Sequence, residues 1–508
     1  MAPGPGRGIA WAFVTEDQKA LTERLPSKTE AAEGLFSRPH AAVTASLAAV
    51  MFLTGFAALA VVPTLPVAAQ DLHGVSLYPL VAGCFVAASL FGGVLGGDWS
   101  DRSGADRPLA AGTVLAVATL LVSATSTSIW QLAAGRFLDG LSAGVIAVAV
   151  NTAIAQAYPE RLRARALALM STCWIIPSLA GPPLAGLVAA WWSWRAVFFG
   201  LAALNLLPAL AVVVLLRRRA GRAAARSSGS TGATGSTGST AERRPRPALK
   251  VAAAVSAGAA LAQYAVSGWD LRHLLCAGGG LALLAAFAPR LLPPGTWRAA
   301  RGLPTSVLLR GLGSGVYFTL EAFVPLLLVT VRHVPAAETG LAFTAAALAW
   351  AATSWAQGRL LEHRPRHQLV AAGALLLALA SVLAVVGTLP AVPALTAASA
   401  MVVAALGMGL LAPSLTLLSI THSPPDRRGY AGSAMQTSQN LGQIAVLGAA
   451  SALFEACLRT HLPDPAGYAA AFALMLVPCV LTALLAARAG GVPAGSVPAG
   501  GVPAEGSG

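Results

Sequence analysis

The chain has 508 residues, of which 56% are hydrophobic and only 11% charged, and its mean hydropathy is +0.69. A soluble chain of this size would carry about 25% charged residues, so the composition excludes a soluble globular protein. The net charge of +14 would suggest nucleic-acid binding in a soluble chain, but in a membrane protein basic residues collect in cytoplasmic loops, and no nucleic-acid partner is expected.

The first 40 residues are mixed in charge and predict a cytoplasmic tail without a cleavable signal peptide. Apolar runs of about 20 residues follow, the length that a helix needs to cross a bilayer. We place fourteen spans, at 41–63, 76–97, 109–127, 130–155, 164–190, 194–216, 250–267, 271–289, 305–331, 339–357, 369–388, 391–419, 430–456 and 467–487. The predicted fold is therefore an all-α polytopic membrane protein.

Basic residues mark one side of these spans. They crowd the segments at 102–107, 161–165, 217–250, 290–301, 359–366 and 427–428, whereas the other loops hold only Arg195, Arg272, Arg332 and Arg459. Since Lys and Arg favour cytoplasmic loops and the number of spans is even, both termini are predicted to be cytoplasmic.

The spans divide into groups. The Gly/Ser/Thr-rich segment 217–249 predicts a flexible basic cytoplasmic linker, and the repetitive tail 488–508 predicts disorder. Gly97 and Asp101 after the second span are weakly echoed by Gly358 and Glu362, which indicates an internal repeat. We expect an N-terminal six-helix bundle (41–216), two extra helices (250–289), a cytoplasmic connector (290–304) and a C-terminal six-helix bundle (305–487).

Nothing in the sequence predicts an enzyme or a metal site. The cysteines lie in or beside apolar runs without CxxC spacing, and the histidines form no HExxH motif. We interpret all five cysteines as small core residues: Cys84, Cys173, Cys276, Cys457 and Cys479. No Walker A motif and no nucleophile–base pair is present, so neither catalytic residues nor a cofactor are expected.

Three motifs carry a family resemblance. The loop Gly97-x-x-x-Asp101-Arg102-x-Gly104-x-x-Arg107 resembles the signature between the second and third helices of the major facilitator superfamily. Leu132-x-x-x-Arg136-x-x-Asp139-Gly140 is similar to its fourth-helix motif. Gly181-Pro182-x-x-Ala185-Gly186 resembles the fifth-helix motif of its exporters.

The resemblance is strongest to the fourteen-helix drug:proton antiporter branch. It implies a proton-coupled exporter of hydrophobic or amphiphilic small molecules such as drugs or antibiotics, with the proton gradient as energy source. The proton-coupled peptide transporters also have fourteen helices, but they carry a charged first-helix motif that residues 41–63 lack. An importer of the same fold and a non-transporting membrane scaffold remain as alternatives. The expected partners are a small-molecule substrate, protons and the lipid bilayer, with the chain a monomer in the plasma membrane.

Charges inside the spans are the candidates for proton coupling, because an ionisable group in a membrane is costly and usually functional. Arg136 and Asp139 lie three residues apart, on one helical face, and protonation of Asp139 would free Arg136. A fixed structural ion pair is the alternative. Glu321 is the only acid in its span, which suits reversible protonation or recognition of a cation; a hydrogen bond to a neighbouring helix is the alternative.

Amides on one face predict a substrate cavity. Gln436, Gln439, Asn440 and Gln443 are spaced by 3, 4 and 7 residues from the first, which aligns them on a helix. They would hydrogen-bond a substrate, or else hold neighbouring helices together. Tyr317, one turn before Glu321, is the aromatic residue that we assign to the same cavity.

Two segments are predicted to control conformation. Gly97, Asp101, Arg102, Gly104 and Arg107 would form a conformational latch, in which Gly97 permits close helix packing, Asp101 caps a helix N-terminus and the arginines pair across the bundle interface. Gly181, Pro182 and Gly186 would form a helix-kink pivot, with simple tight packing as the alternative.

Overall fold

The computed structural model describes residues 34–37, 40–227, 247–266, 268, 270–361, 363–424, 428–459 and 464–490. These residues form helices and connecting turns, with no β-strand among them. Most of the predicted N-terminal tail, the centre of the predicted linker, Glu362 and nearly all of the C-terminal tail lie outside the described residues.

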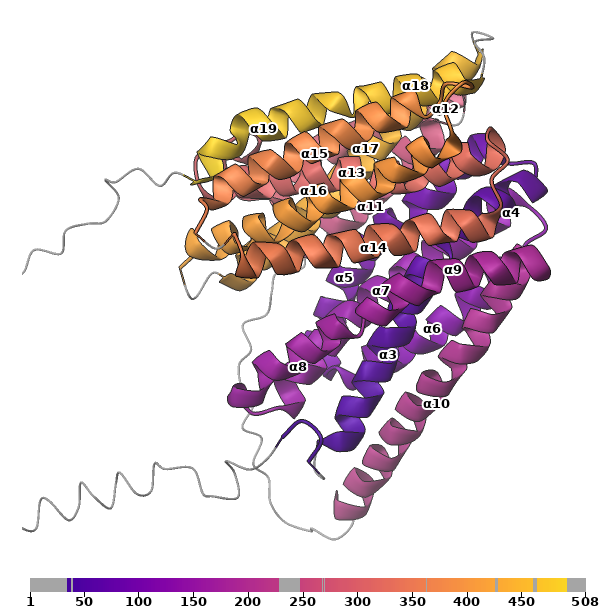
Figure 1. Ribbon diagram of the computed structural model, residues 1–508. Helices are drawn as coiled ribbons and strands as arrows, with labels where there is room; N and C mark the ends of the chain where they lie inside the picture. Colours follow the sequence, from indigo (N-terminus) through magenta and orange to yellow (C-terminus); the bar gives the residue numbers. More distant parts are fainter. Residues whose placement is uncertain are drawn as a thin grey trace, which may run out of the picture.

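The helices form two groups that lie side by side (Figure 1). The first contains α3 (Ala41–Ala60), η1 (Val62–Thr64), α4 (Leu65–Asp71), η2 (Val75–Leu77), α5 (Tyr78–Ser103), α6 (Asp106–Ala124), α7 (Ile129–Ala157), α8 (Glu160–Thr172), α9 (Ile175–Trp191) and α10 (Trp194–Ser227). Its tightest contact joins α5 and α7, where a Cβ on Gly140 would collide with the carbonyl oxygen of Phe85. Glycine at this position therefore lets the two helix backbones touch.

The second group follows the chain to its end. It contains α13 (Leu303–Thr330), α14 (Ala336–Arg359), α15 (Arg366–Val386), α16 (Ala394–Thr421), α17 (Arg428–Arg459), α18 (Asp464–Leu474) and α19 (Leu476–Gly490). Gly442 of α17 lies against the backbone of Gly311 on α13, again with no room for a Cβ. This contact fixes the two helices that carry Glu321 and the row of amides.

Two further helices, α11 (Pro247–Ala265) and α12 (Leu271–Phe287), stand between the groups in the sequence and are followed by η3 (Ala288–Leu291) and η4 (Thr296–Arg298). Ser256 on α11 donates a hydrogen bond to the carbonyl oxygen of Ala87 on α5, and Gln263 donates one to that of Ile444 on α17. α11 thus bonds to both groups. α12 packs mainly on α11 and exposes apolar side chains such as Leu271 and Leu275, as a lipid-facing helix does.

Eleven helical segments of the described residues are long and apolar enough to cross a membrane. Two shorter apolar helices, Ile176–Trp191 and Leu249–Ala265, overlap the predicted spans 164–190 and 250–267, and α14 is not among the eleven. The chain is a multi-pass helical membrane protein. Helix length and hydropathy support eleven spans in the described residues, fewer than the predicted fourteen.

Prolines divide two spans that the sequence predicts as continuous. The span 164–190 is split into α8 and α9 at Cys173 and Trp174, and the span 467–487 into α18 and α19 at Met475. Pro177 and Pro478 each occupy the third position of the following helix. A proline has no N–H to give to the preceding turn, so it is accommodated where a helix begins.

Two predicted boundaries also differ. The first span continues past residue 63 through η1 to Asp71. Helix α10 runs on to Ser227, eleven residues into the segment predicted as a flexible linker from 217. Residues 217–227 are arginines and alanines with one glycine and one serine, and since Ala and Arg are strong helix formers, they extend the helix.

The most extensive direct contact between the two groups joins α9 and α14, towards one end of the molecule. We use "linker end" for the end where α10 stops and α11 starts, and "far end" for the opposite one. Towards the far end, Gly340 at the start of α14 packs against Pro182 and Pro183 of α9, and Thr344 donates a hydrogen bond of 2.8 Å to Leu179. At the linker end, α8 and the last turns of α14 lie apart (Figure 1).

Candidate functional site

A cavity of about 550 Å³ lies between the two groups, and we name it the central cavity. Its walls come from α3, η1, α4, α5, α7, α13 and α17, together with Trp174. This volume lies within the usual range for small-molecule sites, and apolar side chains with a few polar groups line it, as such sites require. Tyr78 and Ala322 line it from the two groups, and the buried hydroxyl of Tyr78 donates a hydrogen bond of 2.9 Å to the carbonyl oxygen of Ala322.

Glu321 is half-buried and lies on the wall of the central cavity, next to Phe318 and Ala322. Among the described residues, no hydrogen bond or ion pair reaches its carboxylate. A carboxylate that faces a cavity without a partner is free to take up a proton or to meet a cationic ligand. The placement agrees with its selection from the sequence, although its role stays a prediction.

Arg136 and Asp139 form an ion pair on α7, as their spacing predicts. Arg136 is 4% exposed, lies 4.4 Å above the ring of Phe85 and leaves its Nε without a partner. Its side chain lines the central cavity, whereas Asp139 is not among the lining residues.

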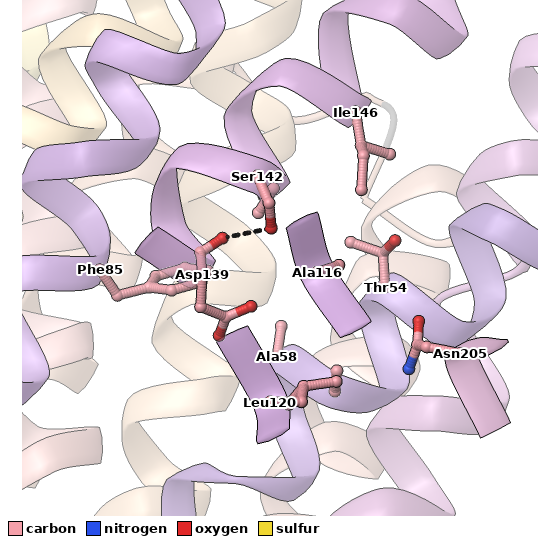
Figure 2. A pocket seen from close by; sticks show the side chains of 11 residues that line it. Thr54, Ala58, Phe85, Ala116, Leu120, Asp139, Ser142, Ile146 and Asn205 are labelled. Atoms are coloured by element: carbon pink, nitrogen blue, oxygen red, sulfur yellow. Dashed lines mark hydrogen bonds between the residues drawn. The ribbon is translucent and has the colours of Figure 1, made fainter. Parts of the chain in front are cut away.

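Asp139 faces a different space. It lines a pocket of about 10 Å³ together with Thr54, Ser142 and Asn205, large enough for about one water molecule. Figure 2 shows the carboxylate turned towards Ala58 and Leu120, while the Ser142 hydroxyl donates to the Asp139 carbonyl oxygen. Only the arginine of the pair therefore meets the central cavity.

All four predicted amides line the central cavity. Gln436 donates a hydrogen bond of 3.2 Å to Asn440, four residues later on α17. Gln439 is bonded to a residue of another helix. Its Oε1 accepts two hydrogen bonds from Arg310 of α13, one from Nε at 3.1 Å and one from Nη2 at 2.6 Å. Arg310 was not selected from the sequence; the signal was present, since it is the only basic residue inside the span 305–331.

The structure does not place Tyr317 in the cavity. Its ring is 8% exposed and packs edge-on against Trp350 of α14, with a centroid distance of 5.0 Å. Successive residues of a helix point about 100° apart, so the cavity-lining aromatic residue is the next one, Phe318. This corrects the assignment of Tyr317 to the substrate cavity.

The predicted latch residues sit at the linker end, but not as expected. Asp101 lies in the last turn of α5, and the N-cap of α6 is Ala105, so Asp101 caps neither helix N-terminus. Arg102 pairs with Asp98 of its own helix rather than across the groups. Arg107 is exposed. In this conformation the arginines do not bridge the interface.

The two latch glycines have different roles. Gly104 ends α5 with φ +76°, a backbone conformation that favours glycine. A Cβ on Gly97 would lie 3.8 Å from its nearest neighbour, a methyl group of Val148, so no close helix approach depends on this glycine. The close approach to α7 is instead made one residue earlier, by Gly96.

The predicted pivot residues Gly181, Pro182 and Gly186 are buried in α9. A Cβ on Gly340 of α14 would lie 2.7 Å from the carbonyl oxygen of Pro182. This segment of α9 is therefore at the contact between the two groups. Pro182 and Pro183 lie inside the helix, where a proline weakens the backbone ladder. Whether α9 bends during function stays a prediction.

Two helical groups with a central cavity between them define the architecture of a membrane transporter. The family model for the Major Facilitator Superfamily matches residues 47–447, and the chain belongs to this family. It is therefore a transporter and not an enzyme, and the family resemblance of the three motifs is confirmed.

Relatives of this chain include named efflux proteins. A probable multidrug-efflux transporter of Mycobacterium tuberculosis is 25% identical over 366 residues, which cover 70% of this chain and 74% of the relative. The class E tetracycline resistance protein of Escherichia coli is 28% identical over 160 residues, or 31% of this chain and 39% of the relative.

Solved structures agree on the fold. A peptide transporter of the POT family superposes with a TM-score of 0.64 at 16% identity, covering 88% of this chain and 95% of that one. A D-xylose–proton symporter superposes with a TM-score of 0.56 at 15% identity, covering 87% and 96%. At these identities the likeness concerns the fold alone.

Proposed function

We propose that the protein is a proton-coupled antiporter that exports hydrophobic or amphiphilic small molecules, such as drugs or antibiotics. The observation that carries the proposal is the carboxylate of Glu321, which faces a cavity of about 550 Å³ between the two groups without a partner in the described part of the chain. The named efflux relatives support the direction of transport. The fifth-helix Gly-Pro motif, which packs at the contact between the groups, supports it as well.

The two groups would act as the N- and C-terminal bundles, 41–216 and 305–487, with 250–289 as two extra helices, making fourteen spans in all. They would rock so that the central cavity opens to each side of the membrane in turn. In the conformation seen here the far end is closed, and we assign the linker end to the cytoplasm, with both termini there and the chain a monomer in the plasma membrane.

Proton and substrate would compete through Glu321. A cationic or polar substrate binds beside the ionised carboxylate, and protonation removes that attraction, so the two ligands favour different states of one group. A ligand shifts a conformational equilibrium only through its different affinities for the two states. Arg136 and Asp139 form a second proton-sensitive pair, and protonation of Asp139 would release Arg136 towards the cavity. The proton gradient is then the only energy source needed.

Inside-out vesicles test this proposal. Tetracycline, ethidium and rhodamine 110 are added singly, and substrate-induced proton movement is followed with a pH-sensitive dye. Wild type is expected to respond to at least one compound, and Glu321→Gln to lose the response. Glu338→Gln, which removes an exposed carboxylate at the start of α14, is the matched control and should behave as wild type.

Two results would contradict the proposal. An unchanged response in both Glu321→Gln and Asp139→Asn would exclude proton coupling by these residues. Proton-driven accumulation of the compounds in right-side-out vesicles would favour the alternative of an importer.

A further inference from the structure

A second cavity, which we name the side cavity, lies next to the central one and also measures about 550 Å³. It is lined by α13, α16 and α17 through Arg310, Thr416, Ser419, Ile420, Gly432, Met435 and Gln436. Gln436 lines both cavities, so they meet at this side chain. The two cavities are therefore adjacent, with the Gln436 side chain at their boundary.

Among the described residues, Arg310 is the one charged side chain that lines the side cavity. Two of its nitrogens donate to the neutral amide oxygen of Gln439, and its buried Nη1 has no hydrogen-bond partner. No carboxylate of the described residues forms an ion pair with it. A guanidinium is always charged and carries five N–H donors in a planar fork, so this cation keeps unused donors and an uncompensated charge beside the cavity.

The two hydroxyl groups of this wall donate to backbone carbonyl oxygens of their own helix. The Thr416 hydroxyl donates to the carbonyl oxygen of Ala412 at 2.9 Å, and the Ser419 hydroxyl donates to that of Thr416 at 2.8 Å. Met435 and Ile420 add apolar surface. The side cavity thus combines one cation with an apolar wall, the complement of an amphiphile that carries an anionic oxygen group.

We propose that the side cavity is a substrate subsite in which Arg310 binds the carboxylate of an anionic or zwitterionic amphiphile. The inference rests on the proposed transport function and narrows its substrate class. Glu321 lies eleven residues further along α13, about 16 Å by helical rise. The two cavities are adjacent at Gln436, so a shorter zwitterion can place its carboxylate at Arg310 while its cationic part lies in the central cavity, on the side towards Glu321. Carboxylates pair well with arginine because two parallel N–H···O bonds match both geometries.

A pair of dyes isolates the carboxylate. Rhodamine 110 carries a free carboxyl group, and rhodamine 123 is its methyl ester, with the same cationic ring system. Binding to purified full-length protein in phosphatidylcholine nanodiscs is measured by fluorescence polarisation, and the ratio of the two dissociation constants is the readout. Wild type is expected to prefer the acid by at least about tenfold, the size expected from charge-assisted hydrogen bonds.

Three variants test whether Arg310 causes the preference for the acid. Arg310→Gln should bring the ratio close to one, and Arg310→Lys should give an intermediate ratio, since the positive charge remains but the two parallel N–H donors are lost. Arg301→Gln removes an exposed arginine just before α13 that lines neither cavity, and should leave the ratio as in wild type.

The outcomes separate the two proposals. A wild-type protein that binds the ester as tightly as the acid, or binds neither dye, overturns the anionic subsite. So does an acid preference that survives in Arg310→Gln. Loss of the preference when phosphatidylglycerol is included in the nanodiscs would assign Arg310 to a lipid headgroup instead. An acid preference without substrate-induced proton movement in vesicles would leave the subsite standing and reject proton-coupled export.

Discussion

The two acids of the membrane region differ in what surrounds them. Asp139 is paired with Arg136 and both are buried, whereas Glu321 faces the central cavity without a partner in the described residues. Removing one member of a buried ion pair leaves the other charge uncompensated and costs about 3–5 kcal/mol. Removing an unpaired carboxylate has no such cost. The same conservative substitution should therefore have unequal effects on stability.

We predict that Asp139→Asn lowers the unfolding temperature clearly, while Glu321→Gln leaves it near that of wild type or raises it. Thermal unfolding of the detergent-purified variants, followed by intrinsic fluorescence, measures both. If the pair is the cause, changing Arg136→Gln in addition to Asp139→Asn should restore part of the loss. Equal destabilisation by the two single variants would show that Glu321 has a structural partner.

Single residues of the site were predictable where local spacing determined the geometry. The Arg136–Asp139 pair follows from positions three apart on a helix, and the amides of α17 follow from the helical period. The hydrogen bond between Gln439 and Arg310 could not be predicted in this way. It depends on how α13 packs against α17 at Gly311 and Gly442. The assignment of Tyr317 to the cavity was wrong for a related reason, since the sequence does not fix which face of α13 lines the cavity.

Between elements, the closest contact of the two groups is made by α9 and α14. Gly340 packs against Pro182 and Pro183, and Thr344 bonds to Leu179 on the same helix. Overpacking of a tight contact costs about 1–3 kcal/mol. Since this contact closes the far end, a larger side chain at residue 340 would disfavour the conformation seen here by about fivefold or more.

We predict that Gly340→Val shifts the protein towards open far-end conformations and slows transport. Distances between spin labels on α9 and α14 measure the shift, with transport assayed in parallel. Gly358→Val in the same helix is the matched control, because nothing lies within 4 Å of a Cβ at that position. A distance distribution that is the same in both variants would show that α9 and α14 do not set the closure.

The helix boundaries show what composition decides and what it leaves open. Apolar runs located the helices, because the bilayer length acts on each run separately. The breaks before Pro177 and Pro478 were missed, since a proline inside an apolar run is tolerated in membrane helices as well as at their starts. The extension of α10 to Ser227 was missed because a basic segment after a span was assigned to a linker, although its residues favour a helix.

At the scale of the whole molecule, the number of membrane crossings depends on the three helices α9, α11 and α14, which are not among the eleven long apolar segments of the described residues. The two groups and the motifs that identify the family were predictable from the sequence, whereas the span count was not, because α9 and α11 are short and α14 is not among the long apolar segments. Of these three helices, α11 is the one that lies outside the two groups, where it is followed by α12. The hydrogen bonds to α5 and α17 place α11 beside both groups. If α11 and α12 each cross, the turn between them lies on the same side as the far end.

We predict that a cysteine at Asp270, in this turn, is labelled from outside intact cells by a membrane-impermeant maleimide. The native cysteines are first replaced by alanine or serine. Asp270 is well exposed, with 66% of its side chain accessible, so burial would not protect it. Thr127→Cys, exposed at the far end between α6 and α7, should be labelled in the same way, and Arg301→Cys at the linker end only in inside-out vesicles. Labelling of Asp270→Cys only in inside-out vesicles would place the turn in the cytoplasm, remove two crossings from the count and leave α11 and α12 as helices that do not span the bilayer.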